Sequence, residues 1–300
     1  MVTAVWAMIS AEMVVLIPGL VLVRRRFASV TGAGKVLVLG PVFEAVALAI
    51  FSAEHFWMAR ELMGIVPSWL PGALFWTYLV GVALLAAAVS FIAWRYVGLS
   101  ALLLALLFLI IVVTVDLPNL PKHIHERLFW TLTVRETVFA GGAMVLAGSV
   151  WAQGKSAGTT LIQTLLMRTG QFIVAGTFLF YAVQHFLFPL FVPGVPLEKM
   201  IPAWMPAPAL LSCFVGTVLL AGGVGLMISR ARRISAATVG SVLVLLTVFF
   251  YVPILIGEIG TPLAVEGVNY VGDTLLFAAT ALLAGFSANL VDELNRLRRI

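Results

Sequence analysis

Charged residues and cysteine are both scarce in this sequence. Only 10% of its 300 residues are charged and 62% are hydrophobic, whereas about a quarter of the residues in a soluble domain are charged. The composition therefore excludes a soluble globular protein and predicts a membrane protein with several spans. The single cysteine, Cys213, rules out an internal disulfide and a dithiol redox pair.

Recognisable catalytic motifs are missing as well. The sequence contains no phosphate-binding glycine loop, no nucleophile elbow, no Cys-x-x-Cys pair and no dense set of zinc ligands. These absences leave open whether the protein is an enzyme.

Long apolar segments are what the sequence has instead. Residues 4–23 form the first, an extra N-terminal span that contains Glu12 and is followed by three arginines. Eight more lie near 36–56, 72–94, 97–115, 130–151, 170–190, 207–229, 236–256 and 270–291. Each approaches the roughly 20 residues that cross the hydrocarbon as a helix, the conformation that pairs every peptide group within the segment. The sequence thus predicts an all-α polytopic membrane protein with nine spans.

Basic residues mark one side of these spans. Most of the 18 lysines and arginines fall in alternate connections, namely Arg24, Arg25, Arg26, Lys35, Arg95, Lys155, Arg168, Arg230, Arg232, Arg233, Arg296, Arg298 and Arg299. The positive-inside rule assigns that side to the cytoplasm. The protein is therefore predicted in the cell (inner) membrane, with its N-terminus outside and its C-terminus cytoplasmic. Because topology accounts for the net charge of +5, the lipid bilayer is an expected partner and nucleic acid is not.

One pattern of residues occurs twice. The first copy is Glu54-His55-Phe56 with a later Pro67-Ser68-Trp69-Leu70-Pro71, and the second is Gln184-His185-Phe186 with a later Pro202-Ala203-Trp204-Met205-Pro206. The second copy has a slightly longer loop, after which Trp69 and Trp204, Gly81 and Gly216, Arg95 and Arg230, and Pro118 and Pro253 all match in one register. Each copy belongs to a unit of four spans. Since four is an even number, the two units are predicted to point the same way, about an axis along the membrane normal.

The repeat divides the chain into five parts. These are an N-terminal span with a basic cytoplasmic loop (1–35), a first four-helix repeat (36–152), a cytoplasmic linker (153–169), a second four-helix repeat (170–292) and a basic cytoplasmic tail (293–300). Within the linker, residues 159–168 suit a short helix on the membrane surface. The long connections all fall on the predicted outer face, at 57–71, 116–129, 191–206 and 257–269. A ligand site is therefore expected to open outward.

The two repeated histidines are the first candidate ligand-binding residues. His55 and His185 end equivalent helices, so they are predicted to face each other across the interface between the repeats. Two imidazoles in that arrangement suit a haem iron or another metal, or a proton donor and acceptor pair for one ligand. The alternative is that each ring pairs with a loop carbonyl or a carboxylate.

The residues around these histidines complete the candidate site. Glu54 and Gln184 precede them, and Trp69 and Trp204 follow in the loops. The indoles are predicted at the headgroup level, where tryptophan partitions in any membrane protein. An aromatic wall over a ligand is the functional interpretation of the same residues.

Acidic residues within the spans are the second group of candidates. Glu44 lies well inside its helix, where an acid costs about 2.5–3.5 kcal/mol and by default suggests function. The alternative is a protonated or paired acid that faces the bundle. Glu136 and Asp273 are predicted in the first turn of matching helices, where the helix dipole favours a carboxylate, and are interpreted as mostly structural. Arg135 is positioned to pair with its neighbour Glu136.

Together these features resemble the DoxX-like family of small four-helix membrane proteins. The resemblance rests on a helix ending in His-Phe, the Pro-x-Trp-x-Pro loop, a glycine in the next helix, an arginine before the third helix and a proline after it. The second copy, from Gly170 to about Pro253, matches better than the first. The resemblance implies a four-helix bundle per repeat and membrane redox chemistry, in which some relatives act with quinones in thiosulfate oxidation and others accompany thiol-redox partners. A thiol-redox role would need cysteines that this chain lacks.

Three functions follow from the sequence as hypotheses. The first is a component of membrane redox chemistry, with quinone or haem as the cofactor, a site at the outer face between the repeats and other membrane redox subunits as partners. The second is a non-enzymatic accessory or scaffold subunit of a larger membrane complex. The third is a lipid-binding protein.

The orientation is testable with single cysteines in a chain whose own thiol is removed by Cys213→Ala. Cysteines replacing Arg25 and Arg232 should stay shielded from an impermeant thiol reagent added outside, whereas one replacing Ser68 should react. Labelling of intact cells, with permeabilised cells as the control for reactivity, measures this. The reverse pattern would overturn both the orientation and the outward location of any site.

Overall fold

The computed structural model describes residues 2–153, 160–194 and 199–296. Its long elements are helices: α1 (Val2–Ser29), α3 (Gly40–Trp57), α5 (Ala73–Ala93), α6 (Val97–Ile111), α8 (Arg127–Ala152), α9 (Leu161–Leu187), α10 (Pro208–Met227), α11 (Arg232–Leu246) and α13 (Ala264–Ala284). Shorter ones are α2 (Gly34–Leu37), α4 (Ala59–Leu62), α7 (Leu117–Asn119), α12 (Val252–Glu258) and α14 (Ala288–Arg296). The all-α prediction is confirmed.

Eight helices in the described part of the chain are long and apolar enough to cross a membrane. They are Val2–Ser29, Gly34–Trp57, Ala73–Ala93, Val97–His123, Leu161–Leu187, Pro208–Met227, Arg232–Glu258 and Ala264–Ala284. The protein is thus a multi-pass membrane protein. The ninth predicted span falls on α8, which has 26 residues but is not among the eight. Arg135 and Glu136 interrupt the apolar run of α8.

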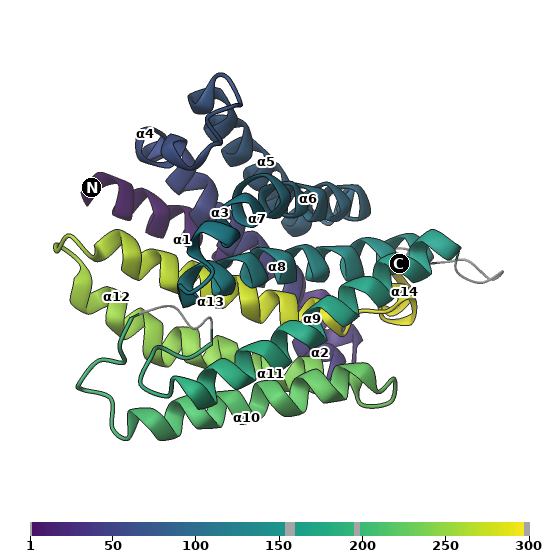
Figure 1. Ribbon diagram of the computed structural model, residues 1–300. Coiled ribbons are helices and arrows are strands. Elements are labelled where there is room, and N and C mark those ends of the chain that lie inside the picture. The colour runs from purple at the N-terminus through teal and green to yellow at the C-terminus, as the bar shows by residue number, and fades with distance from the viewer. Residues whose placement is uncertain (1, 154–159, 195–198, 297–300) are drawn as a thin grey trace.

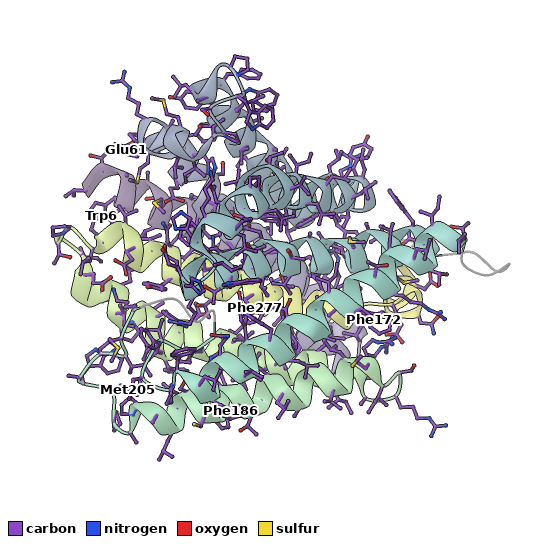
Figure 2. All side chains as sticks on the ribbon, viewed as in Figure 1. Trp6, Glu61, Phe172, Phe186, Met205 and Phe277 are labelled. Atoms are coloured by element: carbon purple, nitrogen blue, oxygen red, sulfur yellow. The ribbon has the colours of Figure 1, made fainter. Side chains whose placement is uncertain are left out.

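Helix α13 runs through the middle of the molecule (Figure 1). It packs against α3, α8 and α11, and its side chains are almost all buried, whereas only 17% of the apolar part of α1 is buried. Phe277 of α13 lies inside, and Trp6 and Phe172 lie at the periphery (Figure 2). An exposed apolar periphery is what a bilayer requires of the helices that contact lipid.

Two helices widen into a π-helical turn before a proline. Helix α6 continues through Val112–Asp116 into α7, and α11 continues through Thr247–Tyr251 into α12. Pro118 and Pro253 stand in the first turn of the helices that follow. A proline lacks an N–H and clashes with the carbonyl four residues earlier. A π-helical turn accommodates that mismatch without ending the helix.

Helices α8 and α13 begin earlier than predicted, at Arg127 and Ala264. The long connections predicted at 116–129 and 257–269 are therefore mostly helical, and only residues 124–126 and 259–263 separate the helical segments. The prediction that Glu136 and Asp273 occupy a first helical turn is wrong. Both lie in the helix interior, because the residues before them also join the helix and bond within the bundle. Arg127 stacks on Phe188, and Asn269 donates to Glu54.

The start of α9 also differs from the prediction. Residues 161–169 belong to this 27-residue helix and do not form a separate surface helix. Thr160 and Gln163 form a capping box that fixes the helix start. The rest of the predicted linker, residues 154–159, lies outside the described residues, as do residues 195–198 of the predicted connection 191–206.

Glycine allows α8 and α9 to pack closely. A Cβ atom on Gly170 of α9 would overlap the carbonyl oxygen of Gly141 in α8 and would lie 2.8 Å from Cγ2 of Val145. On the same helix, a Cβ on Gly176 would meet nothing within 4 Å. Gly170 is therefore required by packing, whereas Gly176 is not.

This difference gives a matched pair of variants. Gly170→Ala should destabilise the protein by about 1–3 kcal/mol, the cost of overpacking a close contact. Gly176→Ala should leave stability unchanged or raise it slightly, because alanine favours the helix. Unfolding in detergent, followed by circular dichroism, measures both variants. Equal stability of the two would contradict the close packing of α8 on α9.

Candidate functional site

An arginine paired with two acids lies inside the helix bundle. Nη1 of Arg135 donates a hydrogen bond of 2.7 Å to Oδ2 of Asp273, and Nη2 donates one of 2.7 Å to Oε1 of Glu136. Nε of Arg135 also donates to the same Glu136 oxygen at 3.1 Å. The side chains of Arg135, Asp273 and Glu136 are only 18%, 6% and 14% exposed in that order. The predicted local pair of Arg135 with Glu136 is confirmed, and Asp273 is an additional partner.

The packing of α8 along α13 brings these residues together. Gly142 of α8 lies against Thr280 of α13, and Arg135 contacts Asp273 with the same sequence separation. The two helices therefore run parallel in one register. A side chain at position 142 would push them apart and separate the ion pair.

Glu54 joins the group from the end of α3. Its Oε1 atom accepts a hydrogen bond of 2.8 Å from Nδ2 of Asn269, which lies one helical turn before Asp273 in α13. The carboxylate of Glu54 is close enough to interact electrostatically with Asp273 and with Arg135. Three helices, α3, α8 and α13, thus contribute to one polar group.

Asp116 adds a fourth acid from the end of the π-helical turn that follows α6. Its charge interacts with those of Glu136 and Arg135. Its Oδ2 atom is buried and accepts no hydrogen bond from the described residues. We call Glu54, Asp116, Arg135, Glu136, Asn269 and Asp273 the arginine–carboxylate cluster.

The cluster holds more negative than positive groups. It contains four carboxyl groups and one guanidinium, and in a low-dielectric interior such an excess of like charge is costly. At least one carboxyl group is therefore expected to hold a proton. A group of acids that shares protons in this way is able to take up or release a proton when a ligand arrives.

The two predicted histidines occupy different surroundings. Nδ1 of His185 donates to the carbonyl of Tyr181 at 2.6 Å, and its Nε2 accepts from the N–H of Gly194 at 2.8 Å. Both ring nitrogens are thus bonded within the protein, to a carbonyl of α9 itself and to a backbone N–H, and not to the loop carbonyl or carboxylate that the sequence offered as the alternative. His55 pairs through Nδ1 with the carbonyl of Phe51 at 2.8 Å.

The surroundings of the two histidines give no support to a shared metal or haem. His55 packs against α5 and His185 against α10, and each ring bonds to backbone atoms of its own surroundings. Among the described residues there is no group of three or more His, Cys, Asp or Glu that could hold a metal ion. Haem ligation stays a prediction, and His185 would have to give up a hydrogen bond to bind iron.

Glu44 lies deeper in the bundle than the cluster. It is fully buried, and neither carboxylate oxygen has a hydrogen-bond partner in the described part of the chain. Glu44 precedes Glu54 by ten residues of α3, which corresponds to about 15 Å along a helix axis. It is therefore not a member of the cluster.

The remaining predicted residues lie nearer the surface. Oε1 of Gln184 is buried without a hydrogen-bond partner among the described residues. Trp69 is 67% exposed, and Trp204 is 53% exposed and packs against Phe250. The two indoles thus stand at the periphery.

Lys199 fastens the connection between α9 and α10 to the bundle. Its Nζ donates to Oε1 of Glu258 at 2.6 Å and to Oε1 of Glu266 at 3.2 Å. Burial by itself lowers the pKa of Lys199, but hydrogen bonds to the two glutamates and their charges outweigh burial and raise it. The loop is therefore held by an ionic contact to both α12 and α13.

Sequence reasoning missed Asp116 and Asn269 and treated Arg135 only as a neighbour of Glu136. One signal was present in the sequence. Asn269 and Asp273 are four residues apart and share a face of an otherwise apolar helix. The pairing with Arg135 and Glu54 joins distant parts of the chain, which a local pattern does not predict.

No family model, curated protein or solved structure matches this chain. The cluster itself is therefore the basis for assigning a function.

The cluster predicts coupled effects of mutation. Arg135→Gln should destabilise the protein by about 3–5 kcal/mol, because it leaves buried carboxylates without their cation. Asp273→Asn should cost less, since Arg135 keeps Glu136. The double variant should cost less than the sum of the two single variants.

Unfolding of the purified protein in detergent with increasing dodecyl sulfate measures these free energies. Glu126→Gln is the control, because it removes an exposed partner of His123 and should change stability little. Strict additivity of the two cluster variants would show that Arg135 and Asp273 do not act as a pair.

Proposed function

We propose that this chain is a DoxX-like membrane protein that exchanges protons with a quinone at the arginine–carboxylate cluster. In this proposal the chain is duplicated into two parallel four-helix units, with α1 as an extra span and α8 as the ninth. The observation that carries it is the guanidinium of Arg135 bonded to Glu136 and Asp273 inside an apolar bundle, with the carboxyl groups of Glu54 and Asp116 close enough to interact with it electrostatically.

Equivalent helix boundaries support the duplication. Helices α5 and α10 begin at Ala73 and Pro208, and α6 and α11 begin at Val97 and Arg232. Both pairs of starts have the same sequence separation as Trp69 and Trp204. The two π-helical turns, Val112–Asp116 and Thr247–Tyr251, share that separation.

A matching contact between helices supports it further. Gly81 of α5 packs on His55 of α3 as Gly216 of α10 packs on His185 of α9. The two proposed units thus bring the same pair of residue types together at the same place.

The position of the cluster suits a site between the units. Helices α3 and α8 and the π-helical turn after α6 belong to the first proposed unit, and α13 belongs to the second. Glu54 and Asp116 lie near the ends of their helices that the charge pattern places outside. This location agrees with a site that opens at the outer face.

The chemistry of quinones matches the groups present. Reduction of a quinone to a quinol takes two electrons and two protons, and an electron-transferring partner subunit would supply the electrons. Asp116 and Glu54 are suited to deliver or accept protons. Arg135 keeps Glu136 and Asp273 in place through charge-assisted hydrogen bonds.

Two buried oxygen atoms are suited to hold a ligand. Oδ2 of Asp116 and Oδ1 of Asn269 have no hydrogen-bond partner among the described residues. A protonated Asp116 would donate to a quinone carbonyl, and Oδ1 of Asn269 would accept from a quinol hydroxyl. A quinone site needs apolar walls and a few such polar groups.

An accessory or scaffold subunit is the second candidate. The observation that favours it is the contact between Arg135 and Asp273, which joins the two proposed units whether or not a ligand binds. In that case α1, whose Trp6, Val14 and Ile17 are exposed, would face a partner subunit or lipid.

Quinone binding tests the first proposal. A short-chain benzoquinone or naphthoquinone should quench tryptophan fluorescence of the purified protein. Asp116→Ala, which leaves no side-chain donor at this position, should weaken binding about ten-fold, the effect of losing one hydrogen bond. Asp116 is the residue of choice because its Oδ2 has no partner to lose among the described residues. Binding by the wild type should also change the pH of a weakly buffered solution.

Glu61→Gln is the matched control, because Glu61 is an exposed acid near the same end of the bundle. It should bind quinones like the wild type. If neither quinone binds and solvent extraction recovers none from the purified protein, the redox proposal fails. A stoichiometric complex isolated from native membranes without quinone would then favour the accessory role.

A further inference from the structure

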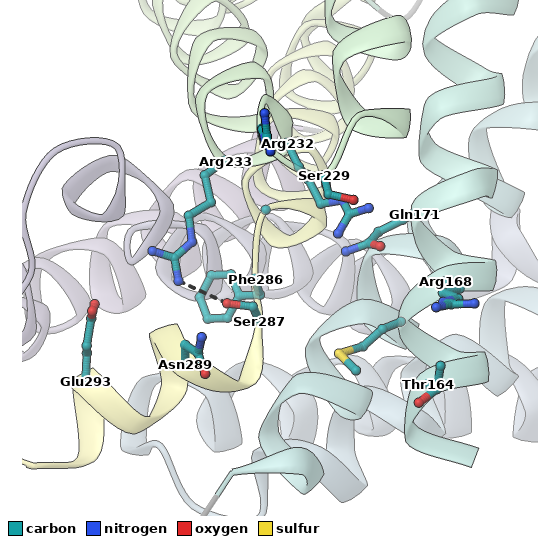
Figure 3. Close-up of a pocket in the computed structure, with 13 residues that line it drawn as sticks. Thr164, Arg168, Gln171, Ser229, Arg232, Arg233, Phe286, Ser287, Asn289 and Glu293 are labelled. Carbon is teal, nitrogen blue, oxygen red and sulfur yellow. Dashed lines mark hydrogen bonds between the residues drawn. The ribbon is translucent and has the colours of Figure 1, made fainter. Parts of the chain in front are cut away.

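A basic cavity lies beyond the C-terminal end of α13, away from the arginine–carboxylate cluster. Its volume is about 620 Å³, within the roughly 300–1,000 Å³ of typical ligand pockets. Its walls come from the start of α9, the turn between α10 and α11, and the segment that joins α13 to α14 (Figure 3). Three distant parts of the chain therefore meet around it.

Arginine dominates the charge of the cavity. Arg168, Arg230, Arg232 and Arg233 line it, with Glu293 as the one acid among its lining residues. No ion pair between described residues neutralises any of the four arginines. The lining thus carries a strong excess of positive charge, which favours an anionic ligand.

Two of the guanidinium groups are held in place by the protein. Nη2 of Arg233 donates to Oγ of Ser287 at 3.0 Å, and Nε of Arg232 donates to the carbonyl of Leu226 at 3.2 Å. Each uses only some of its five N–H donors, so others remain for a ligand. A planar guanidinium in a fixed position binds phosphate through two parallel hydrogen bonds.

Two helices also begin at the cavity. Arg232 is the first residue of the 15-residue helix α11, and α14, a helix of nine residues, begins directly after Ser287. The N-terminal ends of both helices carry partial positive charge, although the N–H of Arg232 bonds to the carbonyl of Ile228 and that of Leu290 to Oγ of Ser287. This adds to the arginine side chains and again favours an anion.

The first turns of α9 connect the cavity with the lipid-facing surface. Thr164, Arg168 and Gln171 lie on the face of α9 that lines the cavity. Next to Arg168 along the same helix, seven residues before it and four residues after it, Leu161 is 74% exposed and Phe172 is 60% exposed, and Phe172 lies at the periphery in Figure 2. An anionic group in the cavity would therefore lie next to a surface that suits acyl chains.

We propose that this cavity binds a phosphate ester. The adjoining apolar surface points to the headgroup of an anionic glycerophospholipid, and free phosphate is the other source of the same chemistry. In this site Arg232 and Arg233 bind the phosphate oxygens. Arg168 adds a positive charge from α9, and Arg230 adds one at the solvent-exposed edge of the cavity. The site is independent of the cluster, so it stands or falls separately from quinone binding.

The full-length protein, delipidated in a neutral detergent, tests this. Three probes are added in turn: phosphatidylglycerol, phosphatidylcholine and inorganic phosphate. Thermal unfolding and native mass spectrometry measure binding. Phosphatidylglycerol should stabilise the protein and stay bound, whereas phosphatidylcholine should do neither. If inorganic phosphate binds and displaces the lipid, phosphate itself is the group recognised.

Variants locate the binding. Arg230→Gln alters an exposed side chain at the mouth and should fold normally, and together with Arg232→Gln it should weaken phosphatidylglycerol binding at least about ten-fold. Arg24→Gln with Arg25→Gln removes the same charge from the exposed end of α1 and should leave binding unchanged. Equal loss in the two double variants would reduce the effect to general surface charge. Three outcomes would overturn the proposal: equal loss of binding in the two double variants, equal binding of phosphatidylcholine and phosphatidylglycerol, or no binding of any anion.

Discussion

The pairing of Arg135 with carboxylates is the constraint on which the rest of the bundle depends. A guanidinium cannot lose its proton in a protein, and an unpaired charge inside an apolar interior costs several kcal/mol. Helix α8 must therefore keep Arg135 against Asp273 of α13. That requirement fixes the register of the two helices, and α13 in turn contacts α3 and α11. A single, mostly buried cation thus contributes to the position of the central helix.

The spans were predictable because the bilayer imposes their length and apolar character. The residues at which the spans begin were not predictable, since Arg127 and Ala264 start helices in stretches whose composition is typical of polar loops. The partners of the candidate site residues were equally hard to predict from the sequence. Glu54 was predicted as a ligand residue, but its partner Asn269 is 215 residues away. Which buried acid meets which donor depends on how helices pack, and a local sequence pattern does not contain that information.

The repeated histidines were candidates for ligand binding, but the structure gives His185 a role in holding the backbone. Equivalent positions in a repeat suggested a shared ligand, yet His185 uses both ring nitrogens to hold the backbone of Tyr181 and Gly194. In contrast, no pattern in the sequence singles out Asp116, because one acid near a proline is typical of a loop. Its buried Oδ2 atom, unpartnered among the described residues, makes it the more informative group. Burial without a partner among the described residues therefore makes Asp116, and not His185, the group that a ligand could engage without breaking a hydrogen bond.

The proposed duplication would explain why the described part of the chain has a single arginine–carboxylate cluster. Asp116 and Tyr251 occupy the same last position of the two π-helical turns, so the second unit has a phenol where the first has an acid. The counterpart of Arg135, next to the aligned pair Glu136 and Asp273, is Gly272, whose absent side chain lets Phe51 of α3 approach α13. A second arginine at that place would have no room beside α3. The first proposed unit thus supplies the cation and three of the four acids, and the second supplies Asp273, Asn269 and the close packing of Phe51 on Gly272. A duplicated chain would in this way have an asymmetric site.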